Sequence, residues 1–566
     1  MGQVLTCVNR DTGNNGAAAA PVDLDNIIML TDSYKVSHYV QYPEGTEEVY
    51  SYFESRGFDS TQVAGHPTVC FFGLQYFIKR YLEGPVVTLE RINRAQTFFD
   101  KHFLGTGAKF NREGWMHILQ EHGGCLPIEI RAVAEGTEVP TSTVLFTLRS
   151  TDPKAYWLTN YLETLLVQVW YPMTVATNSM YQRRMLLEYL KETGTPELID
   201  FKLVDFGFRG VSSVESAAIG DLSHLVSFCS TDVISGIVAA QAYYGADMPG
   251  ASIPASEHST ITSWGRENET DAMRNMLVKY PTGLVACVSD SYNIYDAIDK
   301  KYGQELKDLI CSRDGVLVVR PDSGEPAEIV PELLEKLDKA FAAGTCGKSP
   351  GTTVNAKGYK VLDPHVRLLQ GDGVNTQTVL DILEIIKKKK YSTDNVTFGS
   401  GGALLQRMDR DTQKIAFKCC QVVVKGKTVD VYKDPIHDKG KKSKMGEMFL
   451  IRDSTKPVKS PENRPVTDPN RFAGNCYDLT TVCHYEGGTK RAVWASDLAG
   501  KAGRADPATI GRSSPVAGTD KEKDAALDLL VPVFKNGKCL LSYTLADVRK
   551  RAASSWPGDP GCSTLQ

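Results

Sequence analysis

The sequence predicts an α/β fold: a β/α barrel-like domain of about seven parallel strands beside a discontinuous α+β domain. Two observations predict it. Between Lys202 and Gln406, short apolar runs alternate with helix-like segments, the pattern of βαβ units and a parallel sheet. The segments before and after this stretch do not alternate in that way, and they contain hairpin signals instead.

Each repeated unit begins with a strand-length apolar run. The clear runs are residues 202–206, 225–229, 284–288, 316–319, 366–370 and 395–398. A less regular unit around Ala251–Trp264 brings the total to about seven, which favours closure of the sheet into a barrel.

Charged residues follow these runs, where the carboxyl ends of barrel strands converge on one rim. The charged residues are Arg209, Asp232, Asp290, Arg320, Asp322 and Asp372. Any one of them could be an ordinary capping residue. Six at one mouth indicate a functional site there.

The α+β domain is expected from two separate stretches. We assign residues 161–414 to the barrel-like domain, and residues 23–160 together with 415–566 to the second domain. Runs 417–424 and 428–432 predict one hairpin, and Asn536-Gly537 between apolar runs predicts another. Residues 1–22 read as a disordered tail, and 453–523 as a long insertion or linker.

Composition excludes several classes of protein. The formal net charge of -4 gives no electrostatic case for nucleic acid. We find neither a membrane-spanning run nor a signal peptide, and expect a cytoplasmic protein. The 13 cysteines are scattered without a C-x-x-C pair, so we expect neither a disulfide framework nor a zinc site. The opening MGQVLTC fits acylation at Gly2 and Cys7, the one route to a membrane that the sequence offers.

Two glycine-rich turns are candidate phosphate sites. Gly399-Ser400-Gly401-Gly402 lies between a strand and a helix, where backbone N–H groups can approach a phosphate. Gly371-Asp372-Gly373 lies one unit earlier, and barrels often bind phosphate in their last loops. The cations Arg410, Lys418 and Lys433 follow. No Walker A sequence is present in a suitable context.

The rim carboxylates allow two interpretations. Asp290, Asp322 and Asp372 suit a Mg²⁺ ion that also contacts substrate phosphates, or they cap helices. His258 lies in a loop near the phosphate candidates. It could accept a phosphoryl group, with Glu257 or a rim carboxylate orienting the ring.

Together these residues resemble the nicotinamide phosphoribosyltransferase family, from about Asn26 to Gly446 and again over Val533–Arg551. The motifs that carry the resemblance are TDSYK (31–35), YSYFESR (50–56), GLQYFIKRYL (73–82), DFGFRGVSS (205–213), EHSTIT (257–262), SDSYNIY (289–295), RPDSG (320–324), QGDGV (370–374), FGSGGALLQ (398–406) and KDP (433–435).

The resemblance implies the type II phosphoribosyltransferase fold, a homodimer with shared active sites, and transfer of phosphoribose from phosphoribosyl pyrophosphate to nicotinamide. Phe206 and a second subunit's Tyr34 would sandwich the pyridine ring, with Arg209 and Asp232 fixing the carboxamide. ATP would phosphorylate His258, beside Glu257 and Asp322. The other implied substrate-binding residues are Asp32, Ser252, Asp290, Arg320, Gly371, Asp372, Gly401 and Gly402, with Arg56, Arg410, Lys418 and Lys433 around the pyrophosphate.

The base pocket departs from the family at one position, because Ala286 stands where a serine is usual. That puts one hydrogen bond to the amide in doubt. Two alternatives stay open: a nicotinate phosphoribosyltransferase on the same fold, and a non-catalytic binding or signalling protein on this scaffold.

Overall fold

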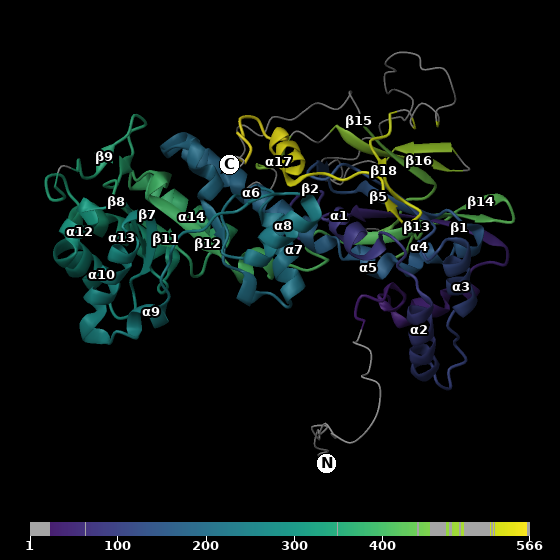
Figure 1. Cartoon of the computed structure of the whole chain (residues 1–566). Coiled ribbons are helices and arrows are strands. Elements are labelled where there is room, and N and C mark those ends of the chain that lie inside the picture. The colour runs from purple at the N-terminus through teal and green to yellow at the C-terminus, as the bar shows by residue number, and fades with distance from the viewer. Residues whose placement is uncertain are drawn as a thin grey trace, which may run out of the picture.

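The computed structural model describes residues 23–62, 64–347, 349–437, 441–452, 471–474, 478–485, 488–491, 521, 525 and 527–562 (Figure 1). The predicted tail 1–22, with Gly2 and Cys7, and most of 453–523 lie outside these ranges. Within them, no helix combines the length and apolarity needed to cross a bilayer.

Five parallel strands form one sheet in the order β6-β12-β11-β8-β7. They are β6 (Leu203–Asp205), β7 (Thr282–Val288), β8 (Asp314–Arg320), β11 (Val366–Gln370) and β12 (Val396–Ser400). Most of their residues are buried, since helices cover the outer face and side chains fill the inner one.

Two extended segments, 229–232 and 251–256, close this sheet into a ring. Backbone hydrogen bonds link β6, the two segments and β7 in turn: Asp232 N–H to Asp205 C=O at 3.0 Å, Thr231 N–H to Ala251 C=O at 3.1 Å and Ala286 N–H to Pro254 C=O at 2.8 Å. The isolated bridges along them are parallel. The prediction of a barrel-like sheet of about seven parallel strands is therefore confirmed, with two strands reduced to single bridges.

Helices connect the strands and surround the ring (Figure 1). They include α7 (Val214–His224), α8 (Ile234–Tyr244), α9 (His258–Thr262), α10 (Glu269–Lys279), α13 (Pro326–Ala340), α14 (Thr376–Lys388) and α15 (Gly402–Leu405). The long helix α6 (Trp170–Thr193) is buried along nearly all of its length and packs against α7.

A seven-stranded antiparallel sheet forms the core of the second domain, in the order β14-β13-β1-β5-β3-β18-β19. Its strands are β1 (Thr46–Ser55), β3 (Ile128–Ala132), β5 (Thr143–Ser150), β13 (Ile415–Val424), β14 (Lys427–Asp430), β18 (Val531–Lys535) and β19 (Lys538–Cys539). Strands from both ends of the chain thus share one sheet, which confirms the discontinuous α+β domain. Its helices include α2 (Leu89–His102), α3 (Arg112–Glu121), α4 (Leu158–Tyr161) and α5 (Glu163–Val167).

The stretch predicted to be an insertion or linker contains ordered strands. Two of its strands, β16 (Leu479–Tyr485) and β17 (Gly488–Arg491), form a three-stranded sheet with β15 (Glu447–Arg452), which lies just before the stretch. The first five residues of β16 are buried, and the Thr481 hydroxyl accepts a hydrogen bond from the Val144 N–H at 2.9 Å. This part of 453–523 therefore packs on the α+β domain.

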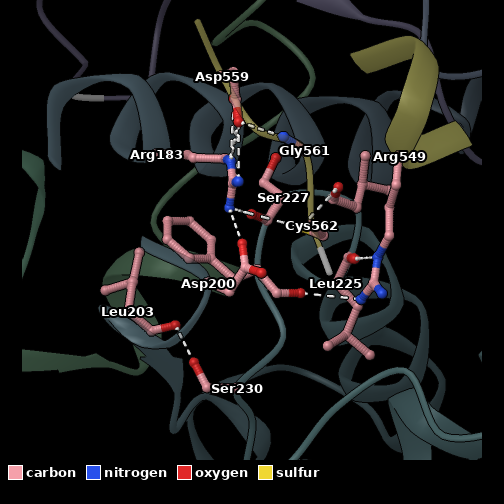
Figure 2. Close-up of polar contacts among 12 residues, drawn as sticks. Arg183, Asp200, Leu203, Leu225, Ser227, Ser230, Arg549, Asp559, Gly561 and Cys562 are labelled. Atoms are coloured by element: carbon pink, nitrogen blue, oxygen red, sulfur yellow. Dashed lines mark hydrogen bonds and ion pairs between the residues drawn. The ribbon is translucent and has the colours of Figure 1, made fainter. Parts of the chain in front are cut away.

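The C-terminal segment is fastened to the barrel by two arginines (Figure 2). Arg549, on α17 (Leu545–Ser554), donates to the backbone carbonyls of Leu225, Phe228 and Pro249. Arg183 on α6 forms ion pairs with Asp559 at 2.9 Å and Asp200 at 2.8 Å.

One expectation about the cysteines is corrected. The spacing of the cysteines indicates no disulfide, yet Cys311 and Cys346 are bonded, with their Cα atoms 5.4 Å apart. These cysteines are 35 residues apart, and only the packing of α12 (Lys307–Ser312) near the end of α13 brings them together.

Candidate active site

Phe206 forms the floor of the barrel mouth. It follows β6 directly and packs against Ala286, Val318, Leu369 and Ile253. Its ring covers two glycines of neighbouring strand ends: a Cβ at Gly399 would lie 2.0 Å from Phe206 Cε2, and one at Gly371 would lie 3.1 Å away. Ala286, the position that departs from the family, contributes a methyl group to this apolar floor.

Asp232 and Ser252 lie together at the rim on the two segments that close the barrel. The Ser252 hydroxyl donates a hydrogen bond to Asp232 Oδ1. Both residues are exposed, as is Arg209 in the short helix Phe208–Gly210. This edge of the mouth therefore offers a carboxylate, a hydroxyl and a guanidinium beside an aromatic floor.

A buried carboxyl pair lies beneath this edge, and the sequence analysis missed it. Asp205, at the end of β6, accepts a hydrogen bond from the Gly207 N–H at 2.7 Å. Burial raises the pKa of Asp205, and it raises the pKa of Asp221 on α7 well above the usual range, with the Asp205 charge adding to the effect. Asp221 lies within an apolar helix, where only its rarity as a buried charge could have signalled it.

His258 lies between two rim carboxylates. Its Nε2 is 3.1 Å from Asp290 Oδ1 and its Nδ1 is 3.7 Å from Asp322 Oδ2. Both ring nitrogens therefore face a carboxylate oxygen, and Nε2 is the one within hydrogen-bonding distance. Asp290 also accepts hydrogen bonds from the Asp322 N–H at 3.0 Å and from the Ser323 hydroxyl. One carboxylate thus contacts the His258 ring and the start of the loop after β8.

Glu257 has a local role in this structure. It occupies the N-cap of α9 and forms a capping box with Thr260, while its carboxylate accepts the Ser259 hydroxyl. The carboxylates that face the His258 ring are thus Asp290 and Asp322.

The remaining rim positions surround a space suited to an anion. Arg320 ends β8, and its buried Nε has no hydrogen-bond partner among the residues that the structure describes. Asp322 and Asp372 follow the adjacent parallel strands β8 and β11. Gly401 and Gly402 begin the short helix α15, and a Cβ at Gly401 would lie only 3.4 Å from the Phe206 carbonyl oxygen.

The other predicted phosphate ligands gather in a second place. Arg56, Arg410, Lys418 and Lys433 line a cavity of about 190 Å³ with Glu163 among its walls. Burial lowers the pKa of Lys418, and the Arg56 and Lys433 charges add to the effect. The Arg56 Nε is buried and lacks a hydrogen-bond partner in the described part of the chain. Such an excess of cations favours an anionic ligand.

Asp32 and Tyr34 lie on the α+β domain as well. Asp32 accepts the Thr164 hydroxyl at 2.8 Å, next to α5, and the Tyr34 ring is 60% exposed. In Figure 1 the elements α9, β7 and β8 lie at one end of the molecule, and β1, β13 and α5 at the other. The strands that carry or precede Lys418 and Arg56, β13 and β1, thus lie apart from the barrel strands β7 and β8 in this view.

Comparisons with known proteins first show the class of protein to which this chain belongs. Residues 201–473 match the nicotinate phosphoribosyltransferase (NAPRTase) family model, and residues 26–130 match the model of the nicotinamide phosphoribosyltransferase N-terminal domain. A crystal structure of nicotinate-nucleotide pyrophosphorylase from Pyrococcus furiosus covers 95% of this chain and 98% of its own, with a TM-score of 0.52 and 13% identity, which shows a shared fold.

Curated relatives identify the family within that class. A nicotinamide phosphoribosyltransferase of Xanthomonas campestris is 50% identical over 434 residues, covering 76% of this chain and 88% of the relative. A second, from Acinetobacter baylyi, is 34% identical over 459 residues, covering 75% and 88%. The chain belongs to the nicotinamide phosphoribosyltransferase family, and the resemblance drawn from its motifs is confirmed.

Proposed function

We propose that this chain is a pentosyltransferase of NAD salvage that transfers phosphoribose from phosphoribosyl pyrophosphate to nicotinamide. The products are nicotinamide mononucleotide and pyrophosphate. The observation that carries the proposal is the 50% identity to a curated nicotinamide phosphoribosyltransferase over most of both chains. The barrel mouth supplies the chemistry that this reaction needs.

Base binding falls to the apolar floor and its polar edge. The pyridine ring stacks on Phe206, whose own ring packs against Gly399 and Gly371, where a Cβ would displace it. Asp232, oriented by Ser252, accepts a hydrogen bond from the carboxamide NH₂, and Arg209 donates to its oxygen. A neutral amide is thus held by one acceptor and one donor.

The transfer itself needs no strong base. The neutral pyridine nitrogen attacks the anomeric carbon of the ribose, a C–N bond forms, and the C–O bond to pyrophosphate breaks. Positive charge develops on the sugar ring and negative charge on the departing pyrophosphate. Asp322 and Asp372 would lie beside the ribose, while Arg320 and the four cations of a second subunit's basic cavity would face the anions.

A Mg²⁺ ion fits part of the predicted ligand set. Asp290 already accepts hydrogen bonds from His258, Asp322 and Ser323, so its oxygens are engaged by protein donors. Asp322 and Asp372 offer carboxylates on adjacent strand ends. Mg²⁺ usually takes one or two carboxylates along with substrate phosphates and water, and would neutralise the charge of the pyrophosphate.

Coupling to ATP would run through His258. A hydrogen bond donated by Nε2 to Asp290 would leave the lone pair on Nδ1, which could then accept a phosphoryl group. The Nδ1 atom faces Asp322, so a phosphoryl group there would enter the ribose and phosphate site. Phosphorylation would thereby change the affinity for phosphoribosyl pyrophosphate without altering the base pocket.

A homodimer with shared sites follows from the separation of the two half-sites. The exposed Tyr34 and the basic cavity belong to the α+β domain, whose strands β1 and β13 lie apart from the barrel strands β7 and β8 in Figure 1. Two chains could pair about a twofold axis so that the barrel mouth of each faces the α+β domain of the other. That arrangement would complete two sites at once.

The test is identification of the product from purified protein, phosphoribosyl pyrophosphate and nicotinamide. We expect nicotinamide mononucleotide and pyrophosphate in equal amounts, with Asp322→Ala as the inactive control. A wild-type chain that forms neither product, under conditions where nicotinamide binds, would support the non-catalytic alternative. Product from nicotinic acid only would support the nicotinate enzyme.

A further inference from the structure

Two histidines and an aspartate converge on the α+β domain, away from the barrel mouth. His117 lies in α3, His122 is the C-cap of the same helix, and Asp152 precedes the short helix Pro153–Ala155. The Nε2 atoms of both histidines lie 2.6 Å from one oxygen, Asp152 Oδ2. The three ligand atoms lie within 4.8 Å of one another.

The carboxylate is held in place from its other side. Asp152 Oδ1 accepts a hydrogen bond from the Lys154 N–H at 2.8 Å, which leaves Oδ2 directed at the two imidazoles. The side chains are 15–25% exposed, so a small ion could reach them from solvent. Both imidazoles therefore converge on a single carboxylate oxygen whose orientation the backbone fixes.

We propose that His117, His122 and Asp152 form a binding site for a divalent late first-row transition-metal ion such as Zn²⁺. Two imidazoles and a carboxylate are a donor set that such ions favour and that Mg²⁺ and Ca²⁺ do not. The ion replaces the two N–H···O contacts with Nε2–metal and Oδ2–metal bonds. Each neutral imidazole then carries its proton on Nδ1, and water completes the coordination.

The present geometry is close to what the ion requires. Zn²⁺ binds imidazole nitrogen at about 2.0–2.1 Å and carboxylate oxygen at about 2.0–2.2 Å, which places tetrahedral ligand atoms about 3.3 Å apart. The two Nε2–Oδ2 separations of 2.6 Å need to widen by only about 0.7 Å, within the reach of small rotations of the side chains.

Two other clusters fit less well. Asp200, Cys229 and Cys562 lie close together, but Asp200 is paired with Arg183 and the Arg183 guanidinium also donates to Cys562 (Figure 2). Cationic groups there oppose a second cation. Cys346, near Asp363 and His365, is bonded to Cys311. The His117, His122 and Asp152 cluster differs from both, because no lysine or arginine side chain pairs with its donors among the residues that the structure describes.

The metal would join the end of α3 to the turn before α4, inside the domain that carries Tyr34 and the basic cavity. It is independent of the proposed transfer reaction, so the test does not rely on activity. Metal-free full-length protein is titrated calorimetrically with Zn²⁺, and separately with Co²⁺ followed by its visible absorption. The variants are His117→Gln with His122→Gln, and Asp152→Asn, with His102→Gln as the control.

We expect one ion per chain, a loss of tenfold or more in affinity in the cluster variants, and no change in His102→Gln. The Co²⁺ spectrum of the wild type should show nitrogen and oxygen ligation without a thiolate charge-transfer band. Unchanged affinity in the cluster variants, a thiolate band, or no binding by the wild type would each overturn the proposal. The Co²⁺ spectrum keeps the test decisive even where a variant folds poorly.

Discussion

Gly399 lies so close beneath Phe206 that a methyl group at position 399 would stand 2.0 Å from the Phe206 Cε2 atom. The glycine at the end of β12 thus permits the aromatic floor on which the pyridine ring is proposed to stack. Glycine is needed here for space under a ring, since Gly399 does not have a positive φ angle.

Gly399→Ala should therefore displace the Phe206 ring and weaken nicotinamide binding. Loss of one aromatic stacking contact is worth about 0.5–1.5 kcal/mol, so we expect KM for nicotinamide to rise by up to about tenfold. Steady-state kinetics with each substrate varied will measure it. Thr397→Ser, on the same strand, is the control. Equal KM values for Gly399→Ala and wild type would show that Phe206 does not support the base.

Replacement of His258 should separate transfer from ATP coupling. We expect His258→Ala to retain phosphoribosyl transfer, because the pyridine nitrogen needs no base, and to lose stimulation by ATP. The measurement is the apparent KM for phosphoribosyl pyrophosphate with and without ATP. An unchanged response to ATP in a variant that binds nicotinamide normally would exclude His258 as the phosphoryl acceptor.

Mixed dimers should recover activity that neither parent has. Tyr34→Ala and Asp322→Ala each disable every site in their own homodimer, while a heterodimer of the two keeps one intact site of two. We expect roughly half of the wild-type activity per heterodimer, as closed twofold symmetry requires. Differently tagged chains allow the heterodimer to be purified and assayed. Inactive heterodimers of verified composition would argue against shared sites.

Acid should destabilise the fold through two buried histidines. Burial lowers the pKa of both His66 and His224 to about 4. Their unfolded values lie near 6.5, so the unfolded chain binds more protons between about pH 6.5 and 4, and stability falls as the pH falls through that range. At pH 5 the loss is about 2 kcal/mol for each histidine relative to pH 8.

His224 offers the cleaner variant for that measurement. Its ring accepts from Ser179 at 3.0 Å and donates to the Leu203 carbonyl at 3.2 Å, which fixes the neutral form. His224→Gln, compared with His102→Gln at the surface, should reduce the difference in urea-unfolding free energy between pH 8 and pH 5 by about 2 kcal/mol. If the unfolding free energy of both variants changed equally between pH 8 and pH 5, His224 would not contribute to the loss of stability in acid.

The barrel could be predicted because its strands carry a strong periodic signal, and the strand-end charges then mark the rim. The segments 229–232 and 251–256 were harder to predict as strands, because each joins the ring only through isolated bridges. Asp221, the Cys311–Cys346 bond and the His117, His122 and Asp152 cluster were missed because each depends on contacts between residues distant in the sequence or hidden in a helix. Glu257 is the opposite case, because it was predicted to act at the site from its place in a family motif. Its contacts in the structure are those of a helix cap.

The choice between two bases tests the central claim most directly. In the proposed site, Asp232 would accept a hydrogen bond from the nicotinamide NH₂ but would face a second negative charge in nicotinate. At about 4 Å and an effective dielectric constant near 20, that repulsion is roughly 4 kcal/mol, and Arg209 offsets part of it. We therefore measure kcat/KM for nicotinamide and for nicotinic acid in the wild type and in Asp232→Ala. The account predicts a wild-type preference for nicotinamide of about a hundredfold or more, roughly 3 kcal/mol, which narrows in Asp232→Ala. Comparable wild-type values for the two bases would contradict it.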